Sequence, residues 1–584
     1  MLVSNVMHQQ QLLFLAALLP LFMGVALGDI PDGFELDKAG TAILTKYCKK
    51  CHGDDDAYPG LDVADRNGLL DPIIENEDPF IVPGNAENSR IWEVITDDYM
   101  PPEDQPQLSS SDKEILSKWI DSGANFPPEE REIREYIGES TVLKMISRDI
   151  DRLTNDELAH TRYFSLVHLW NNISGEDPTT EEDLRMLRAA VSKLLNSLSN
   201  RPRIARPRIV DKKFGTLLAI DIRKIGWKSG DWQALLRAYP YALKVPVREY
   251  DILVRQTETR VPFVRADWFI NTASRPPLYH DLLDIPANAE ELERRLGVNI
   301  RENFQTGQLI RAAFQESLIS DQNRMVERHD PTGGGRYYWK SYDIKPNAGV
   351  EGDFTRRPLG PVFNGNRGQA GAFIHDGGEI IFGLSNGLQG YMLVDGKDGR
   401  IDTGPPDVVS DKNRFGGNNL IANGISCMGC HKHGMIPWVK DDIRPLFLNR
   451  QNQYIGEQVI KLFPPDDQAQ KVVTQDKQHF LRALEQSIGP FIRSKDQSNA
   501  PIESFPDPIT KSARAYFREL GPETAAVELG ITLEKLKAIA SLPRFRDLGI
   551  GNFANGGKIS RENWERVYGR VARELGLGVP IRSF

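Results

Sequence analysis

The sequence predicts a multidomain protein with a small all-α domain near the N-terminus, an α+β middle domain and a helical C-terminal region. A chain of 584 residues exceeds the usual size of one hydrophobic core, which favours several domains of about 100–200 residues each. Apolar residues follow helical spacing towards both ends of the chain, whereas the middle contains short strand-like runs separated by turn residues. The apolar content of 40% is typical of a folded globular protein.

The N-terminal segment has the pattern of a secretory signal peptide. An apolar run from Leu12 to Leu27 precedes the first charged residue, Asp29, and small residues near Gly28 fit a cleavage site. We expect residues 1–28 to be removed and the mature chain to be periplasmic or otherwise exported, without a membrane span. Because no Lys or Arg precedes the apolar run, an uncleaved membrane anchor is the alternative.

The charge of the chain argues against a nucleic-acid partner. The formal net charge is -9 at pH 7. Binding to a phosphate backbone depends on clustered Lys and Arg that release counterions, and an acidic chain is poorly suited to it. We therefore expect no nucleic-acid partner.

All four cysteines of the chain lie in two copies of the pattern Cys-x-x-Cys-His. The first copy is Cys48-Lys-Lys-Cys51-His52 and the second is Cys427-Met-Gly-Cys430-His431. Two thiols on one helical turn can form thioethers with the two vinyl groups of haem, and the following His can bind the iron as proximal ligand. The sequence therefore predicts two covalently attached haem c groups, one at each motif.

Other uses of these cysteines explain the motifs less completely. A thioredoxin-like redox pair has no need of the following His, and structural zinc ligands are usually local, whereas the two motifs lie far apart in the sequence. A disulfide within each motif stays open from the spacing, although it leaves both histidines unexplained.

Residues 29–128 are expected to form the all-α domain. Apolar residues at helical spacing lead into the first motif, and an amphipathic segment from Leu108 to Gly123 closes the domain. Met100 lies between them, followed by two prolines. A thioether on a proline-stiffened loop suits the distal iron site, so Met100 is the predicted distal ligand of the first haem. The alternative is that Met100 fills the core.

The first domain resembles the planctomycete-type cytochrome c domain over about 100 residues. The residues that carry the resemblance are Cys48-Lys-Lys-Cys-His-Gly53, Ile81-Val-Pro-Gly-Asn-Ala-Glu-Asn-Ser-Arg-Ile-Trp92, Met100-Pro-Pro102 and Trp119-Ile-Asp-Ser-Gly-Ala124. The resemblance implies that Cys48 and Cys51 hold the haem thioethers, with His52 proximal and Met100 distal. It also implies electron transfer, because both axial positions are filled.

The remainder of the chain is expected to contain three regions. Residues 129–210 form a helical region with a proline-broken linker, residues 211–445 form an α+β domain with the second motif, and residues 446–584 form a helical C-terminal region. The predicted strands of the middle domain are 216–222, 336–342 and a hairpin over 379–394. Residues from Arg356 through the second motif are similar to uncharacterised exported bacterial cytochromes, which adds no function.

The predicted distal ligand of the second haem is His375. It lies far enough from His431 to reach the opposite face of the ring, and it precedes two flexible glycines. Met392 and His479 are also far enough away. The alternative for His375 is an ordinary loop histidine bonded to Asp376.

These features together predict an exported dihaem c-type cytochrome that transfers electrons. We expect an electron carrier rather than a catalyst, with a redox partner protein that the sequence does not identify. One alternative is a dihaem oxidoreductase that reduces peroxide or a nitrogen oxide at the second haem. Another is a non-catalytic haem sensor or scaffold.

Overall fold

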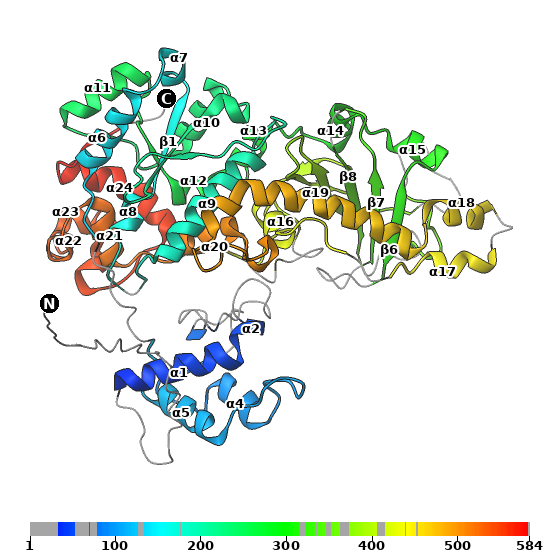
Figure 1. The fold of residues 1–584 in the computed structure, drawn as a ribbon, viewed down its shortest axis with the longest axis horizontal. Helices are drawn as coiled ribbons and strands as arrows, with labels where there is room; N and C mark the ends of the chain where they lie inside the picture. Colours follow the sequence, from blue (N-terminus) through cyan, green and yellow to red (C-terminus); the bar gives the residue numbers. More distant parts are fainter. Residues whose placement is uncertain are drawn as a thin grey trace, which may run out of the picture. The chain divides into compact units, whose positions relative to one another are not determined.

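The chain divides into two compact units, residues 1–129 and 130–584, in a computed structural model (Figure 1). The structure describes residues 33–52, 63, 69–70, 79–126, 134–175, 177–315, 323–333, 336–345, 352–361, 373–405, 411, 415–437, 440–450 and 454–581. The expected signal peptide, residues 1–28, lies outside the described residues. The expectation of a multidomain chain that mixes helices and sheets is confirmed.

Helices make up the described part of the first unit. They are α1 (Gly33–Tyr47), α2 (Lys49–His52), α4 (Arg90–Thr96) and α5 (Ser110–Asp121). Helices α1 and α5 pack together at Gly40, where an added Cβ atom would lie only 2.3 Å from Cγ of Trp119. Gly40 therefore permits the close approach of the two helices, and the fully buried indole of Trp119 fills the core between them.

The second unit contains a large antiparallel sheet with strand order β11-β10-β9-β8-β7-β6. Its strands are β6 (Ile310–Phe314), β7 (Asn323–His329), β8 (Tyr338–Ile344), β9 (Gly377–Gly383), β10 (Gln389–Asp395) and β11 (Arg400–Ile401). The predicted hairpin corresponds to β9 and β10, which pair from Gly377 with Asp395 to Gly383 with Gln389. The strand expected over 336–342 corresponds to β8.

A smaller sheet has the order β2-β3-β1-β5, with β1 antiparallel to β3 and parallel to β5. Its strands are β1 (Thr161–Ser165), β2 (Arg208–Ile209), β3 (Leu217–Asp221) and β5 (Val264–Arg265). Strand β3 corresponds to the strand expected over 216–222. A further short pair joins β4 (Leu243–Lys244) to β12 (Val579–Pro580), which lies near the C-terminus.

Many helices surround these sheets. Those before the large sheet are α6 (Glu139–Ile150), α7 (Asn155–Leu158), α8 (Val167–Trp170), α9 (Glu181–Ser197), α10 (Ser229–Ala238), α11 (Arg248–Thr257), α12 (Ala266–Ala273), α13 (Leu278–Leu282), α14 (Ala289–Leu296) and α15 (Ile300–Thr306). Those after it are α16 (Ile425–Cys430), α17 (Arg444–Phe447), α18 (Tyr454–Leu462), α19 (Asp466–Ile492), α20 (Pro508–Phe517), α21 (Pro522–Leu529), α22 (Leu533–Ala540), α23 (Pro543–Arg546) and α24 (Arg561–Glu574).

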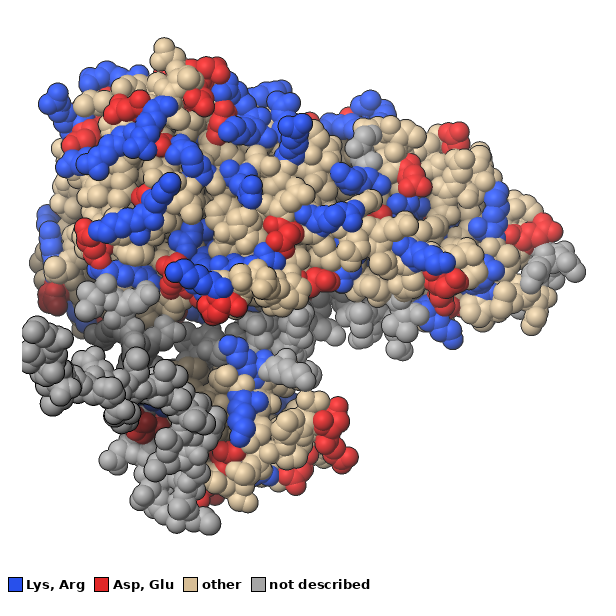
Figure 2. Space-filling model, viewed as in Figure 1, with Lys and Arg blue, Asp and Glu red and all other residues tan. Residues whose placement is uncertain are grey.

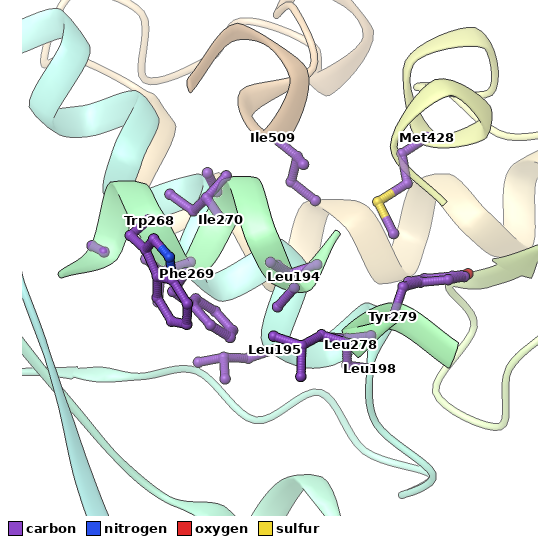
Figure 3. Packing of buried hydrophobic residues seen from close by; sticks show 14 of the residues in the cluster. Leu194, Leu195, Leu198, Trp268, Phe269, Ile270, Leu278, Tyr279, Met428 and Ile509 are labelled. Carbon is purple, nitrogen blue, oxygen red and sulfur yellow. The ribbon is translucent and has the colours of Figure 1, made fainter. Parts of the chain in front are cut away.

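Helix α9 lies at the centre of the second unit. A capping box of Thr180 and Asp183 begins it, and most of its residues are buried. Helices α12, α19 and α20 pack against it, and Figure 3 shows its leucines beside α12 and Ile509 of α20. The C-terminal region expected over 446–584 therefore does not stand apart, because its helices pack into the same core as residues from Phe164 onward.

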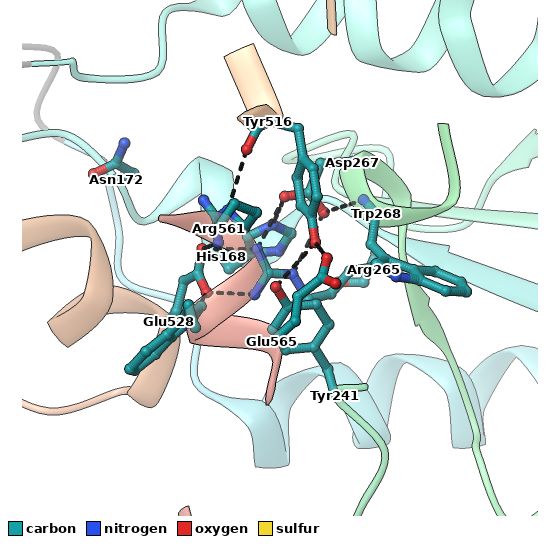
Figure 4. A network of polar contacts seen from close by, with 12 residues as sticks. His168, Asn172, Tyr241, Arg265, Asp267, Trp268, Tyr516, Glu528, Arg561 and Glu565 are labelled. Carbon is teal, nitrogen blue, oxygen red and sulfur yellow. Dashed lines mark hydrogen bonds and ion pairs between the residues drawn. The ribbon is translucent and has the colours of Figure 1, made fainter. Parts of the chain in front are cut away.

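A buried network of charges joins the C-terminal helices to β5 and α12 (Figure 4). The guanidinium of Arg265 donates to both carboxylate oxygens of Glu528 at 2.6 and 2.8 Å, and Arg561 donates to the same carboxylate at 2.7 Å. Arg265 also pairs with Asp267 at 2.9 Å, and Asp267 bonds Nε2 of His168 at 2.9 Å. Because each buried charge has an opposite partner, the network holds elements distant in sequence together.

The surface of the second unit carries charges of both signs. Figure 2 shows Lys and Arg interspersed with Asp and Glu over the visible face. Among the helices that the structure describes, none is long and apolar enough to cross a membrane.

The contact between Gly40 and Trp119 predicts that Gly40→Ala destabilises the first unit by about 1–3 kcal/mol. The added methyl group would overlap the indole, and this cost exceeds the gain of at most ~1 kcal/mol in helix propensity. Hydrogen exchange measured by mass spectrometry on peptides from α1 and α5 would report the change. Ala42→Leu, at an exposed position of the same helix, is the matched control and should leave exchange nearly unchanged.

The charge network predicts that Glu528→Gln lowers the unfolding free energy of the second unit by about 3–5 kcal/mol at pH 7, because two buried guanidinium groups lose their anion. Burial opposes ionisation of Glu528, but Arg265 and Arg561 hold its pKa at about 2. The contribution of ionised Glu528 to the unfolding free energy is therefore fully present above the unfolded pKa of about 4.3, and it is lost as the pH falls towards 2.

Denaturant unfolding of the wild type and of Glu528→Gln at pH 7 and pH 3 would test this prediction. Glu291→Gln, which removes a partly exposed carboxylate paired with Arg294 and Arg295, is the matched control and should cost less than about 1 kcal/mol. An equal loss of stability in the two variants would contradict a special role for the buried network.

Candidate haem-binding sites

The first Cys-x-x-Cys-His motif forms one helical turn directly after α1. The backbone N–H of Cys48 donates to the carbonyl of Leu44 at 2.9 Å, and the N–H of His52 donates to the carbonyl of Cys48 at 2.9 Å. The motif therefore continues the helical path beyond Tyr47. This turn brings the two thiols and the imidazole together within five residues, which is the arrangement that covalent haem attachment requires.

The chemical state of these side chains also fits haem attachment. Cys48 is half-buried against the core of the first unit, whereas Cys51 is exposed. Burial, followed by the neighbouring charge of Cys51, raises the pKa of the Cys48 thiol to about 11. Burial lowers the pKa of His52, whose Nδ1 is buried and has no hydrogen-bond partner among the described residues. A neutral imidazole is the form that binds a metal.

Met100 lies in the segment between α4 and α5. Its backbone N–H donates to the carbonyl of Val94 at 2.9 Å, and 39% of the residue's surface is exposed. Filling of the hydrophobic core therefore does not account for a Met at this position. The role of Met100 as distal iron ligand stays a prediction.

The second motif shares with the first the backbone hydrogen bond from its His to its first Cys. Helix α16 ends at Cys430, and the N–H of His431 donates to the carbonyl of Cys427 at 2.8 Å. No disulfide joins any of the four cysteines. The two motifs therefore present their side chains from equivalent helical turns, although their surroundings differ.

Helix α16 is embedded in the core of the second unit. Met428, between the two cysteines, is buried and points towards Tyr279 (Figure 3). Gly424 has a φ of +88°, and an added Cβ atom there would lie 2.4 Å from the carbonyl oxygen of Ser274. Gly429 similarly packs against the ring of Phe415. The second motif thus belongs to the fold of the larger unit and does not form a separate small domain.

A cavity lies beside both thiols of the second motif. Its walls include Arg324, Asp343, Glu379, Leu393, Cys427 and Cys430, so it opens between α16 and one face of the large sheet. The cavity itself has a volume of only about 40 Å³, which is room for a few water molecules. The two thiols lie at its wall, and a porphyrin attached to them would have to displace the surrounding side chains.

The imidazole of His431 is oriented for metal binding. Its Nδ1 donates to the backbone carbonyl of Gly434 at 3.2 Å, and its Nε2 faces Oε2 of Glu379. Metal-binding histidines typically donate the N–H of their other ring nitrogen to a carboxylate or backbone carbonyl, which fixes the tautomer. His431 is therefore suited to be the proximal ligand.

Glu379 brings a negative charge into the second site. Its Oε2 lies 3.7 Å from Nε2 of His431. Burial opposes ionisation, but the hydrogen bond and charge of His431 and the charge of Arg324 lower the pKa of Glu379 to about 2. Burial and this carboxylate raise the pKa of Cys427 well above its usual range, and burial raises that of Cys430 to about 12. Both thiols are consequently protonated near neutral pH.

The structure does not bring His375 to the cavity. Its ring packs edge-on against Tyr342 at 5.1 Å between ring centroids. Tyr342 and Asp343 are successive residues of β8 and face opposite sides of the sheet, and Asp343 lines the cavity. His375 therefore lies on the other face of the sheet, where burial lowers its pKa. Nor do Met392 and His479 line the cavity.

The residue that the sequence analysis missed is Glu379. It is the only charged residue in the strand sequence Gly377-Gly-Glu-Ile-Ile-Phe-Gly383. A charge within an otherwise apolar strand has to face either solvent or a buried partner, and the strand is central in its sheet. A single charged residue in an otherwise apolar strand could therefore have marked Glu379 as a candidate functional residue from the sequence.

Comparison with known proteins agrees with the first site. Residues 48–104 match the family described as planctomycete cytochrome C, and this segment includes the first motif and Met100. Neither the curated proteins nor the solved structures gave a match to the chain. The expected resemblance is thereby confirmed, and haem c is the cofactor that it implies. Residues 48–104 are therefore similar to a planctomycete-type cytochrome c domain.

Proposed function

We propose that this protein is an exported dihaem c-type cytochrome that transfers electrons. The observation that carries the proposal is the shared geometry of the two motifs. In each, the N–H of the His donates to the carbonyl of the first Cys, at 2.9 Å for His52 and 2.8 Å for His431. The turn that we propose for thioether attachment in the first unit thus recurs beside the cavity of the second unit.

The two motifs would hold their haems in the same way. Cys48 and Cys51 would hold one haem through thioethers, and Cys427 and Cys430 would hold the other. His52 and His431 would bind the iron through their imidazoles. Haem c supplies one-electron redox chemistry when bound.

The first site favours electron transfer over catalysis. Met100 is a thioether available as the second axial ligand opposite His52, and an iron with both axial positions filled has no place for a substrate. The exposure of Cys51 implies that the haem edge would lie near the surface. Such an edge lets a partner protein approach closely.

Export is the third part of the proposal. It rests on the signal-peptide pattern of residues 1–28 and on the two motifs, since haem c is attached outside the cytoplasm.

The charge of the first unit favours a basic redox partner. Residues 29–128 contain 22 Asp and Glu but only 8 Lys and Arg. A surface of one dominant sign attracts a partner of opposite sign and accelerates its encounter. The redox partner is therefore expected to present Lys and Arg around its own redox centre.

Mass spectrometry of the purified mature protein should show the chain plus two haem groups. The double variant Cys48→Ser/Cys51→Ser should lose one haem, and Cys427→Ser/Cys430→Ser should lose the other, because each pair would hold its haem covalently. Visible spectra of the same samples would show the remaining haem. A wild-type mass with one haem, or none, would overturn the dihaem proposal.

The acidic first unit should prefer a cationic redox reagent. With the Cys427→Ser/Cys430→Ser variant, which retains only the first haem, stopped-flow oxidation by hexaammineruthenium(III) should show stronger electrostatic acceleration than oxidation by anionic ferricyanide. Raising the ionic strength from 0.01 to 1 M shortens the screening length from about 30 to 3 Å. The cationic rate should then fall and the anionic rate should rise. Opposite salt effects would exclude an acidic contact surface.

A further inference from the structure

The second unit contains a cleft that is separate from the Cys-x-x-Cys-His motifs. Its volume is about 570 Å³, which lies within the usual range for sites that bind small molecules. The residues that line it come from the end of α8, from α9 and from the hairpin between β2 and β3. They include Trp170, Arg188, Ile209, Lys212, Lys213 and Phe214. None of the described residues that line the cleft belongs to either motif, so the cleft does not depend on haem attachment.

The hairpin turn that forms one wall of the cleft is held in a single shape. The carboxylate of Asp211 accepts from the backbone N–H of Thr216 at 3.0 Å and from that of Leu217 at 2.8 Å. The hydroxyl of Thr216 also donates to this carboxylate at 2.7 Å, and the N–H of Gly215 donates to the carbonyl of Asp211 at 2.8 Å. An Asp that caps its own turn in this way fixes the loop, so the cleft is already formed without a ligand.

Arg188 joins helix α9 to this turn. Only 8% of the residue is exposed, and its guanidinium donates to the carbonyl of Gly215 at 3.2 Å and pairs with Glu181. Gly215 has a φ of +66°, and an added Cβ atom there would lie 2.7 Å from Nη1 of Arg188. Glycine at this position therefore allows the close approach of the guanidinium, which places a fixed positive charge in the wall of the cleft.

Two aromatic rings form an apolar corner in the cleft. The rings of Trp170 and Phe214 lie 5.4 Å apart between centroids, with an angle of 64° between their planes. The indole Nε1 of Trp170 donates to the carbonyl of Glu135 at 2.9 Å, which fixes the orientation of the indole. Both aromatic residues are partly exposed. A ligand ring can therefore stack on one of them and meet the other with its edge.

The charge of the lining favours an anion. Three cationic side chains, Arg188, Lys212 and Lys213, and one carboxylate, Glu181, line the cleft. Lys212 is exposed and has no ion-pair partner among the described residues. Lys213 pairs with Glu135, but the two side chains are 69% and 65% exposed, so water competes strongly with this contact. The cleft is therefore net positive in a chain whose formal net charge is -9.

We propose that this cleft binds a small organic anion that carries a ring with an apolar face, such as an aromatic acid or a sugar acid. The ring would pack into the corner formed by Trp170 and Phe214. The carboxylate would contact the ammonium groups of Lys212 and Lys213, and the fixed charge of Arg188 would add to their attraction. This ligand site goes beyond electron transfer, because it uses no residue of either motif.

Calorimetric titration of the full-length protein tests this proposal. The probes are 2-naphthoate and glucuronate, with 2-naphthalenemethanol and glucose as their uncharged counterparts. At least one of the two anions should bind once per chain, and its uncharged counterpart should bind at least about 5-fold more weakly, because it cannot pair with the lysines. Binding of 2-naphthoate alone would identify an aromatic acid as the ligand class, and binding of glucuronate alone a sugar acid. Absence of binding by both anions would overturn the proposal, as would equal binding of the uncharged counterpart.

Three variants locate the binding site. Lys212→Gln/Lys213→Gln should weaken binding of the anion at least about 5-fold and leave binding of its uncharged counterpart nearly unchanged. Phe214→Leu keeps an apolar side chain but removes the flat ring, so it should weaken binding of both about 2- to 10-fold. Lys535→Gln/Lys537→Gln on α22 removes the same charge elsewhere on the unit and is the matched control. Equal affinity of the wild type and the Lys212→Gln/Lys213→Gln variant for the anion would overturn the assignment of this cleft.

Discussion

The packing of α16 into the core of the second unit is the constraint on which the second site depends. Met428 anchors the helix beside Tyr279, and the close approach at Gly424 fixes where the helix begins. The two thiols are consequently held at a fixed place against the face of β9 and β10. Any cofactor attached there has to fit between a helix and a sheet that both belong to the main core.

The two motifs share a local geometry and differ in their surroundings. The first lies at the end of α1 in a small unit, with Cys51 exposed. The second is buried among charged groups, including Glu379 and Arg324. Because axial ligands, burial and nearby charge set the reduction potential of a haem, identical attachment motifs can serve different purposes in one chain.

The parts of the molecule that depend on local pattern could be predicted from the sequence. The two motifs, the strand β8 and the hairpin of β9 and β10 follow from residue type and spacing over a few residues. Long-range packing was not accessible in this way. The C-terminal helices have ordinary amphipathic patterns, which do not reveal that α19 and α20 pack on α9.

The placement of the candidate ligand His375 shows the same limit at the scale of one residue. His375 lies four residues before Glu379, and this even spacing would place both side chains on one face of a continuous strand. Strand β9 begins only at Gly377, so the alternation does not extend to His375, and the sequence alone does not reveal that boundary. Preference for His as an iron ligand favoured His375, whereas the sheet register places Glu379 at the cavity.

The burial of Cys427 limits the order of events during maturation. Only 2% of this residue is exposed, and the core around it includes residues from Phe164 to Ala572. Nearly the whole second unit must therefore be synthesised before this core can close. In a chain that takes up haem at Cys427, an attachment enzyme can reach the thiol only while the polypeptide is still open. Covalent bond formation would then come first, and the porphyrin would serve as a nucleus around which the sheet and helices assemble.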